Sequence, residues 1–114
     1  MSVKIGTRQV GDVTVADVNG KLTLGEGSSV LRETLRNLSA QGHKKVLLNL
    51  SGVTYLDSSG IGELVAGYTT ITNSGGRLKL VNLTSKVQNP LQTTKLYTVF
   101  DIYEDETEGV KSFS

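Results

Sequence analysis

Apolar and polar residues alternate along the first twenty positions, as they do in strands with a buried face. Val3 and Ile5 alternate with polar residues, and a second alternating stretch runs from residue 12 to residue 18. Gly11 and Asp12 favour a turn between them, so the two stretches predict a β-hairpin. The second strand is expected to carry apolar side chains on both faces: Val13 and Val15 on one, Ala16 and Val18 on the other.

Three further strands are predicted between residues 21 and 83. Residues 19–20, Asn-Gly, are a second turn signal, so residues 21–24, KLTL, are expected to form a short edge strand. Residues 44–50, KKVLLNL, are apolar almost without a break, which is typical of a strand covered on both faces in the middle of a parallel sheet. Residues 77–83, RLKLVNL, alternate and predict another strand.

Two stretches have the period of an α-helix. In residues 25–42, Leu31, Leu35 and Leu38 share one face. Ser28 or Ser29 is expected to cap the start of this helix, and Gly42 lies where a left-handed residue commonly follows the end. The second helix follows residue 57 and ends at residues 73–76, NSGG. Its helical period rests on five residues: Ile61, Leu64, Val65, Tyr68 and Ile71.

The last third of the chain has weaker signals. Residues 84–96 predict a helix that Pro90 interrupts or splits. Residues 100–105 predict a short strand, and residues 106–113 predict a frayed terminal helix. Because strands alternate with helices, we expect an α/β fold. The expected fold is one domain over residues 1–114, with a mixed sheet, an N-terminal antiparallel hairpin, parallel βα units and about four helices.

Composition narrows the function classes. The net charge is +1 without a Lys/Arg run, so neither a nucleic-acid nor a membrane partner is indicated. The absence of cysteine excludes disulfides, thiolate catalysis and cysteine metal sites. No apolar run approaches the ~20 residues of a membrane span, and the N-terminus does not resemble a secretion signal. A cytoplasmic location is therefore expected.

Nucleophilic catalysis by Ser58 is not supported by its surroundings. Ser58 follows a strand and starts a helix, as a hydrolase serine does, but residues 56–62, LDSSGIG, are not G-x-S-x-G. The single histidine, His43, precedes the strand that Ser58 follows. A strand of about 6 residues separates them by about 20 Å, far beyond hydrogen-bond reach. We expect no catalytic residues and interpret His43 as a solvated loop residue.

Metal and nucleotide sites are not predicted either. Residues 25–27, GEG, lack the third glycine and the lysine of nucleotide loops, and loop flexibility explains them. The acidic residues of the tail lack the glycine and spacing of a calcium loop and are interpreted as a solvated terminus. They are Asp101, Glu104, Asp105, Glu106 and Glu108. We expect no cofactor, and we expect that the protein is not an enzyme.

The junction at residues 57–60, DSSG, allows two interpretations. Asp57 or Ser58 could simply cap the following helix. One capping side chain suffices, however, and here three polar residues stand in a row. Gly60 and Gly62 fall in the first helical turns, where each costs up to ~1 kcal/mol relative to alanine, and close approach by another molecule would explain them. A phosphate on Ser58 would lie where a helix N-terminus favours an anion.

These residues carry a resemblance. Residues 46–65, VLLNLSGVTYLDSSGIGELV, resemble the core signature of STAS domains, and closely that of bacterial anti-anti-sigma factors. The similarity extends over most of the chain, because residues 19–22, NGKL, and residues 75–83, GGRLKLVNL, occur in matching order. The most specific part is D-S-S-G, an apolar residue and glycine after an apolar strand.

The resemblance implies a partner switch. In that family the unmodified antagonist binds an anti-sigma factor that is also a serine kinase of the GHKL type, and binding frees the sigma factor. The kinase phosphorylates the first serine of the motif, here Ser58, and the complex dissociates until a serine phosphatase resets it. ATP and magnesium would belong to the kinase. The residues that the resemblance assigns to partner binding are Gly20, Thr23, Asp57, Ser58, Ser59, Gly60, Ile61 and Gly62.

One departure and several alternatives remain. Antagonists of this type often have an acidic residue near the position of Thr23, so the partner contact there is expected to differ. STAS domains also serve as unswitched scaffold subunits of larger signalling or lipid-transport complexes, which is the main alternative. A serine hydrolase with an unusual base and a nucleotide-binding regulator are the others.

Overall fold

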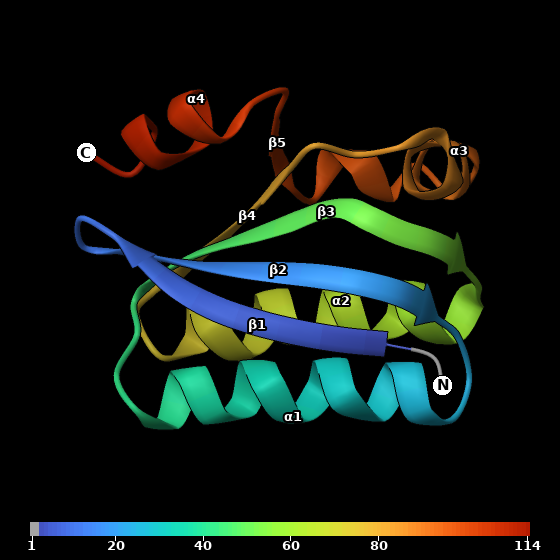
Figure 1. Cartoon of the computed structure of the whole chain (residues 1–114), viewed down its shortest axis with the longest axis horizontal. Coiled ribbons are helices and arrows are strands. Elements are labelled where there is room, and N and C mark those ends of the chain that lie inside the picture. The colour runs from blue at the N-terminus through green and yellow to red at the C-terminus, as the bar shows by residue number, and fades with distance from the viewer. Residues whose placement is uncertain (1–2) are drawn as a thin grey trace.

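The computed structural model describes residues 3–114 as a five-stranded sheet with helices on both faces (Figure 1). The strands are β1 (Val3–Val10), β2 (Val13–Leu22), β3 (Lys45–Leu56), β4 (Arg77–Val81) and β5 (Asp101–Tyr103). The helices are α1 (Glu26–Ala40), α2 (Ser58–Asn73), α3 (Ser85–Thr93), the 3₁₀ turn η1 (Leu96–Thr98) and α4 (Glu106–Lys111). The expected mixed α/β fold, with its hairpin and four α-helices, is confirmed.

The sheet has the order β1-β2-β3-β4-β5, in which β1 pairs antiparallel with β2 and every other pair is parallel. Helices α1 and α2 cover one face, and α3 and α4 lie over the other (Figure 1). The apolar strand β3 is therefore central, as its composition predicts. Because β2 to β5 are parallel, their carboxyl ends lie along one edge of the sheet, where ligands of open α/β sheets gather.

Two apolar clusters lie on the sheet. Ala16 and Val18 belong to the larger one, which includes the inward faces of α1 and α2. Val13 and Val15 belong to the smaller one, which Phe113 completes after the end of α4. The predicted division of β2 between two faces is thus confirmed, and the strand is buried on both sides.

Residues 19–20 do not form a turn, and residues 21–24 do not form an edge strand. β2 continues to Leu22 between β1 and β3, with shifts of register on either side of Asn19 and Gly20. The shift is accommodated by two glycines, because Gly20 adopts a φ of 114° and Gly52 of β3 leaves room for the side chain of Asn19. A sequence typical of a hairpin turn here serves as a bulge inside the sheet.

The expected serine cap of α1 is also wrong. Gly25 is the N-cap residue and makes no side-chain capping bond. Ser28 lies inside the first turn, where its hydroxyl donates to the carbonyl oxygen of Thr23 at 2.9 Å. Gly42 does adopt the left-handed conformation expected after the helix, with a φ of 87°. Pro90 lies inside α3 without splitting it.

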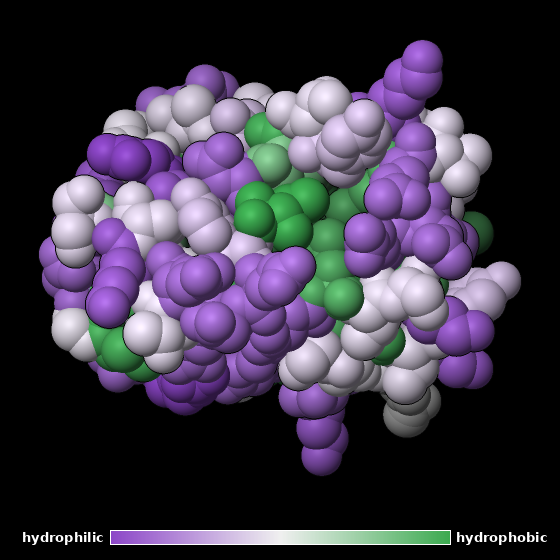
Figure 2. Space-filling view, turned by 90° about the horizontal axis from the view of Figure 1, so that it is seen from above, coloured by the Kyte–Doolittle hydropathy of each residue, from purple (hydrophilic) through white to green (hydrophobic). Residues whose placement is uncertain are grey.

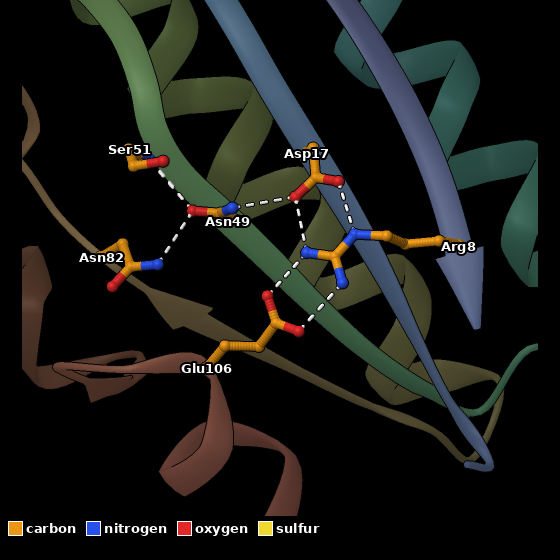
Figure 3. A network of polar contacts seen from close by, with 6 residues as sticks. All are labelled: Arg8, Asp17, Asn49, Ser51, Asn82 and Glu106. Carbon is orange, nitrogen blue, oxygen red and sulfur yellow. Dashed lines mark hydrogen bonds and ion pairs between the residues drawn. The ribbon is translucent and has the colours of Figure 1, made fainter. Parts of the chain in front are cut away.

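The C-terminal helix is fastened to the sheet rather than frayed. Arg8 on β1 forms ion pairs with Asp17, at 2.7 Å, and with Glu106 of α4, at 2.6 Å (Figure 3). These contacts raise the pKa of the arginine and lower the pKa of both carboxyl groups. Asn49 on β3 donates to Asp17 and so extends the network across the sheet.

A buried lysine holds the other end of α4. Lys79 is 4% exposed, and its Nζ donates to the carbonyl and hydroxyl oxygens of Ser112. The same ammonium lies 4.6 Å from the centre of the Phe113 ring, a cation–π contact. Interpreting the acidic tail as merely solvated is therefore wrong for Glu106, and for Asp105, whose carboxylate caps α4.

We predict that Glu106→Gln loosens α4 locally, because the neutral amide loses the charge that attracts Arg8. Exposed ion pairs contribute up to about 1 kcal/mol, so amide hydrogen exchange in residues 106–113 should accelerate about threefold to fivefold. Exchange in β3 should not change. Glu104→Gln is the matched control, since the carboxylate of Glu104 has no partner within residues 3–114. Equal acceleration in both variants would contradict the assigned role of the ion pair.

Candidate functional site

The junction between β3 and α2 is built around the carboxylate of Asp57. Asp57 is the N-cap of α2 in extended conformation, and its Oδ1 accepts the backbone N–H of Gly60 at 3.0 Å. The cap expected from the sequence is therefore present, and it uses Asp57 rather than Ser58. A helix start leaves about four N–H groups without helical partners, and this carboxylate satisfies one of them.

The same carboxylate ties α2 to a second segment of the chain. Its Oδ2 accepts the backbone N–H of Leu24 at 3.0 Å, in the loop between β2 and α1. The backbone N–H of Asp57 in turn donates to the carbonyl oxygen of Leu22 at 3.3 Å. The hydrogen bonds from Leu24, which has the larger effect, and from Gly60 stabilise the ionised carboxylate. They hold the pKa of Asp57 below its usual range. The carboxylate is thus a fixed negative charge at neutral pH.

Ser58 is the first residue of α2 and is exposed, whereas Ser59 is half-buried. The hydroxyl of Ser58 has no hydrogen-bond partner in the part of the chain that the structure describes. It lies next to an ionised carboxylate at a helix N-terminus, where backbone N–H groups and the helix dipole favour an added anion. Its environment leaves the hydroxyl accessible to an enzyme from outside.

Gly60 and Gly62 have different reasons for lacking a side chain. A Cβ on Gly60 would lie 2.2 Å from the carbonyl oxygen of Leu22, so the backbone of β2 itself excludes it. Close approach by another molecule does not explain this residue, and that interpretation is wrong for Gly60. A Cβ on Gly62 would meet nothing within 4 Å, and the residue is exposed. The fold does not require a glycine at position 62.

The structure brings most of the predicted partner-binding residues together. Thr23 lies between the two residues that bond to Asp57, at the same edge of the sheet as Ser58. Ile61 is half-buried and packs against the larger apolar cluster. Gly20 does not reach this edge, because it pairs with Val53 inside the sheet, ahead of the carboxyl end of β3.

Two features of this edge were not found from the sequence. Leu24 is 79% exposed, the most exposed large apolar side chain in the described residues, and its backbone is held by Asp57. Arg32 of α1 and Glu63 of α2 form an ion pair of 2.8 Å that joins the two helices one turn beyond the junction. The available signal for Leu24 is an apolar residue in KLTL, a segment whose pattern predicts an edge strand.

His43, the single histidine, lies too far from Ser58 to act as its general base. His43 precedes β3 and Ser58 follows it, so the two lie at opposite ends of a 12-residue strand. His43 is not a purely solvated residue, however, since its Nδ1 lies 2.8 Å from the hydroxyl oxygen of Thr14 and the residue is half-buried. Within residues 3–114, no group of three histidine, aspartate or glutamate residues could hold a metal ion. No helix of the same residues is long and apolar enough to cross a membrane.

Comparison with known proteins agrees with this architecture. The STAS domain family matches residues 4–109. The chain belongs to the STAS domain family. Among individual STAS proteins, the chain is 29% identical over 111 residues to the anti-sigma-B factor antagonist of Bacillus subtilis. The match covers 97% of this chain and 100% of that protein.

Solved STAS structures have the same fold. An anti-sigma factor antagonist from Mycobacterium paratuberculosis superposes with a TM-score of 0.87 at 21% identity, over 97% of this chain and 93% of the other. The Bacillus cell fate determinant SpoIIAA in its phosphorylated form superposes with a TM-score of 0.75 at 18% identity, over 97% of this chain and 100% of the other.

We predict opposite effects of alanine at the two glycines. Gly60→Ala should lower the free energy of unfolding by about 1–3 kcal/mol, because the added methyl group collides with backbone that cannot move independently. Gly62→Ala should leave it unchanged or raise it by up to about 1 kcal/mol, because alanine favours the helix and space is free. Urea unfolding of both variants measures the difference. A stable Gly60→Ala protein would contradict the close contact with Leu22.

We predict that Asp57→Asn destabilises the protein at neutral pH by about 1 kcal/mol, because an amide cannot accept from both Leu24 and Gly60 in the same geometry. The folded pKa of Asp57 is lowered, so its stabilisation is present above the unfolded value of about 3.9 and is lost as pH falls through the folded value. The difference between wild type and variant should therefore shrink below about pH 4.

Urea unfolding from about pH 7 to about pH 3 would measure this dependence. Asp101→Asn is the control, because Asp101 is an exposed aspartate on β5, away from the junction. A difference between wild type and Asp57→Asn that stays constant over this range would show that the two hydrogen bonds do not depend on the ionised carboxylate.

Proposed function

We propose that this protein is an anti-sigma factor antagonist whose binding to an anti-sigma factor is switched off by phosphorylation of Ser58. The observation that carries the proposal is the exposed, unpartnered hydroxyl of Ser58 at the first position of α2, beside the ionised carboxylate of Asp57. The similarity to the anti-sigma-B factor antagonist over the full length of that protein supports the same role here.

The switch would act through local charge. A phosphate on Ser58 adds about −1.5 to −2 charges at neutral pH. Two unit charges about 5 Å apart repel by about 3 kcal/mol at an effective dielectric constant of 20, and solvent screening reduces this. Because Asp57 also holds the N–H of Leu24, the repulsion would bear on the loop that carries this exposed leucine. The docking surface would change in charge and in shape at the same point.

The fold itself would not need to rearrange. SpoIIAA is known in an unphosphorylated and in a phosphorylated form, and both superpose on nearly the whole of this chain, with TM-scores of 0.80 and 0.75. A protein of this fold can therefore carry a phosphate and remain folded. This supports a switch that changes one edge of the sheet rather than the core.

The protein would be a binding module rather than an enzyme. Its partner would be an anti-sigma factor that is also a serine kinase of the GHKL type, and a serine phosphatase would restore the unmodified form. ATP and magnesium would be bound by the kinase. All three proteins would act in the cytoplasm. The exposed Leu24 and the open space at Gly62 flank Ser58 and offer the kinase an apolar contact and a close approach to the helix.

We predict that Ser58→Asp lowers the affinity for the kinase at least tenfold, because a permanent charge next to Asp57 imitates part of the phosphate. Ser58→Ala should bind as tightly as wild type and should not be released by ATP, because the acceptor is missing. The measurement is affinity capture from cells of the source organism, with intact-mass analysis of the bait before and after ATP. Wild type should gain one phosphate group and dissociate.

Ser59→Ala is the matched control, since Ser59 is the neighbouring hydroxyl and is half-buried. It should be phosphorylated and released like wild type. Capture of a stable complex by all four proteins regardless of ATP would favour an unswitched scaffold role. Phosphorylation of Ser58→Ala at full rate would place the acceptor elsewhere.

A further inference from the structure

A groove of about 330 Å³ lies between the last residues of β3 and α3. Its apolar lining comes from Tyr55, Leu56 and Pro90, and its polar lining comes from α3. Figure 2 looks onto the face of the molecule that carries α3 and α4, where largely polar surface surrounds a hydrophobic centre. Because Leu56 directly precedes Asp57, the groove borders the junction that carries Ser58.

Exposed apolar side chains gather at this junction. Within residues 3–114 the structure exposes four large apolar side chains, and two of them, Leu24 and Tyr55, belong to this edge of the sheet. Tyr55 is 54% exposed and precedes Asp57 by two positions, while the backbone of Leu24 is hydrogen-bonded to Asp57. Exposed aromatic and apolar residues grouped beside a groove are typical of a protein–protein contact.

The free charges beside the groove are positive. Lys21 is the neighbour of Tyr55 on β2, and Lys86 lines the groove on α3. Both lysines are exposed, and neither ammonium group has a hydrogen-bond or ion-pair partner in the part of the chain that the structure describes. The exposed ring of Tyr55 therefore has one lysine without a counter-charge on its β2 side and another on its α3 side.

The carboxylates at the starts of α1 and α2 do not offset these lysines. Asp57 accepts two backbone N–H groups, and Glu63 forms its ion pair with Arg32. Glu26 also has an interaction of its own. No aspartate or glutamate is among the described residues that line the groove. A carboxylate on a partner would find free cationic donors at this surface, whereas a lysine or arginine would find no free acceptor of opposite charge.

We propose that the anti-sigma factor docks an acidic segment on this surface, with an apolar side chain against Tyr55 in the groove and carboxylates opposite Lys21 and Lys86. The inference rests on the proposed function, because it assigns a chemistry to the partner that binds beside Ser58. It also gives the switch a second effect. A phosphate on Ser58 adds negative charge beside the same surface, so it would repel an acidic partner directly.

Reversal of charge tests this surface. Lys21→Glu combined with Lys86→Glu should weaken binding of the purified kinase about tenfold, because two attractions become repulsions. Arg77→Glu is the matched control, since Arg77 is exposed and begins β4 at the opposite edge of the sheet. This control changes the net charge at one position but should bind within about twofold of wild type. The amide spectrum of each variant shows whether it is folded.

The salt dependence of binding separates charge from damage to the fold. The affinity of wild type should fall between about 20 mM and about 300 mM salt, because screening weakens attraction between exposed charges. The double lysine variant should lose this dependence or bind more tightly as salt is added. A wild-type affinity that does not depend on salt, no loss in the double variant, or an equal loss in Arg77→Glu would each overturn the proposal.

Two peptides test the surface without the kinase, and they decide the inference if no kinase is captured. Titration of the ¹⁵N-labelled protein with the end-blocked peptide EELFEE should give saturable shifts of the amide signals of Tyr55, Ser85 and Lys86. The peptide KKLFKK, with the same apolar centre and the opposite charge, should give none. No shifts with EELFEE at millimolar concentration, or equal shifts with KKLFKK, would contradict an acidic partner.

The switch and the surface fail separately in these measurements. If Ser58→Asp binds the kinase like wild type while the double lysine variant does not, the switch is wrong and the surface stands. If Ser58→Asp loses binding while the double lysine variant keeps it, the surface is wrong and the switch stands.

Discussion

The carboxyl end of β2 is where two helices meet the sheet backbone to backbone, and the geometry of the junction between β3 and α2 depends on this contact. A Cβ on Gly27 of α1 would lie 2.2 Å from the carbonyl oxygen of Lys21, and one on Gly60 of α2 would lie equally close to that of Leu22. Both helices therefore begin against the same short piece of β2. Leu24, in the loop that follows β2, is 79% exposed.

Asp57 makes this contact into a single unit. Its carboxylate accepts a hydrogen bond from the loop after β2 and another from the first turn of α2. The same negative charge therefore holds both segments. An anion added at Ser58 would lie beside this charge at neutral pH, because the same two hydrogen bonds hold the pKa of Asp57 low. The proposed switch follows from this arrangement and needs no rearrangement of the core.

Most of the fold could be predicted from the sequence because its strands and helices have clear periods. β3 is apolar on both faces, and α1 repeats leucine at helical spacing, so local pattern and tertiary role agree. The failures come from tertiary contacts that a local pattern does not contain. Asn19-Gly20 has the composition of a turn, but the neighbouring Gly52 lets it remain in the sheet. The ion pair of Arg8 and Glu106 joins residues 98 positions apart, which no local pattern can indicate. At the site, the cap at Asp57 was predictable, whereas the hydrogen bond from Leu24 to Asp57 joins residues 33 positions apart and has no local signal.

Gly60 and Gly62, at the start of α2, differ in whether the fold has room for a side chain. Gly60 is required by the chain's own backbone, so folding alone preserves it. Gly62 faces open space at a helix position where alanine would be more stable, so the fold gives no reason to retain it. On the proposed function, a descendant that lost its kinase would keep the first glycine and drift at the second. If the proposed function holds, position 62 would record whether a protein of this kind still meets its partner.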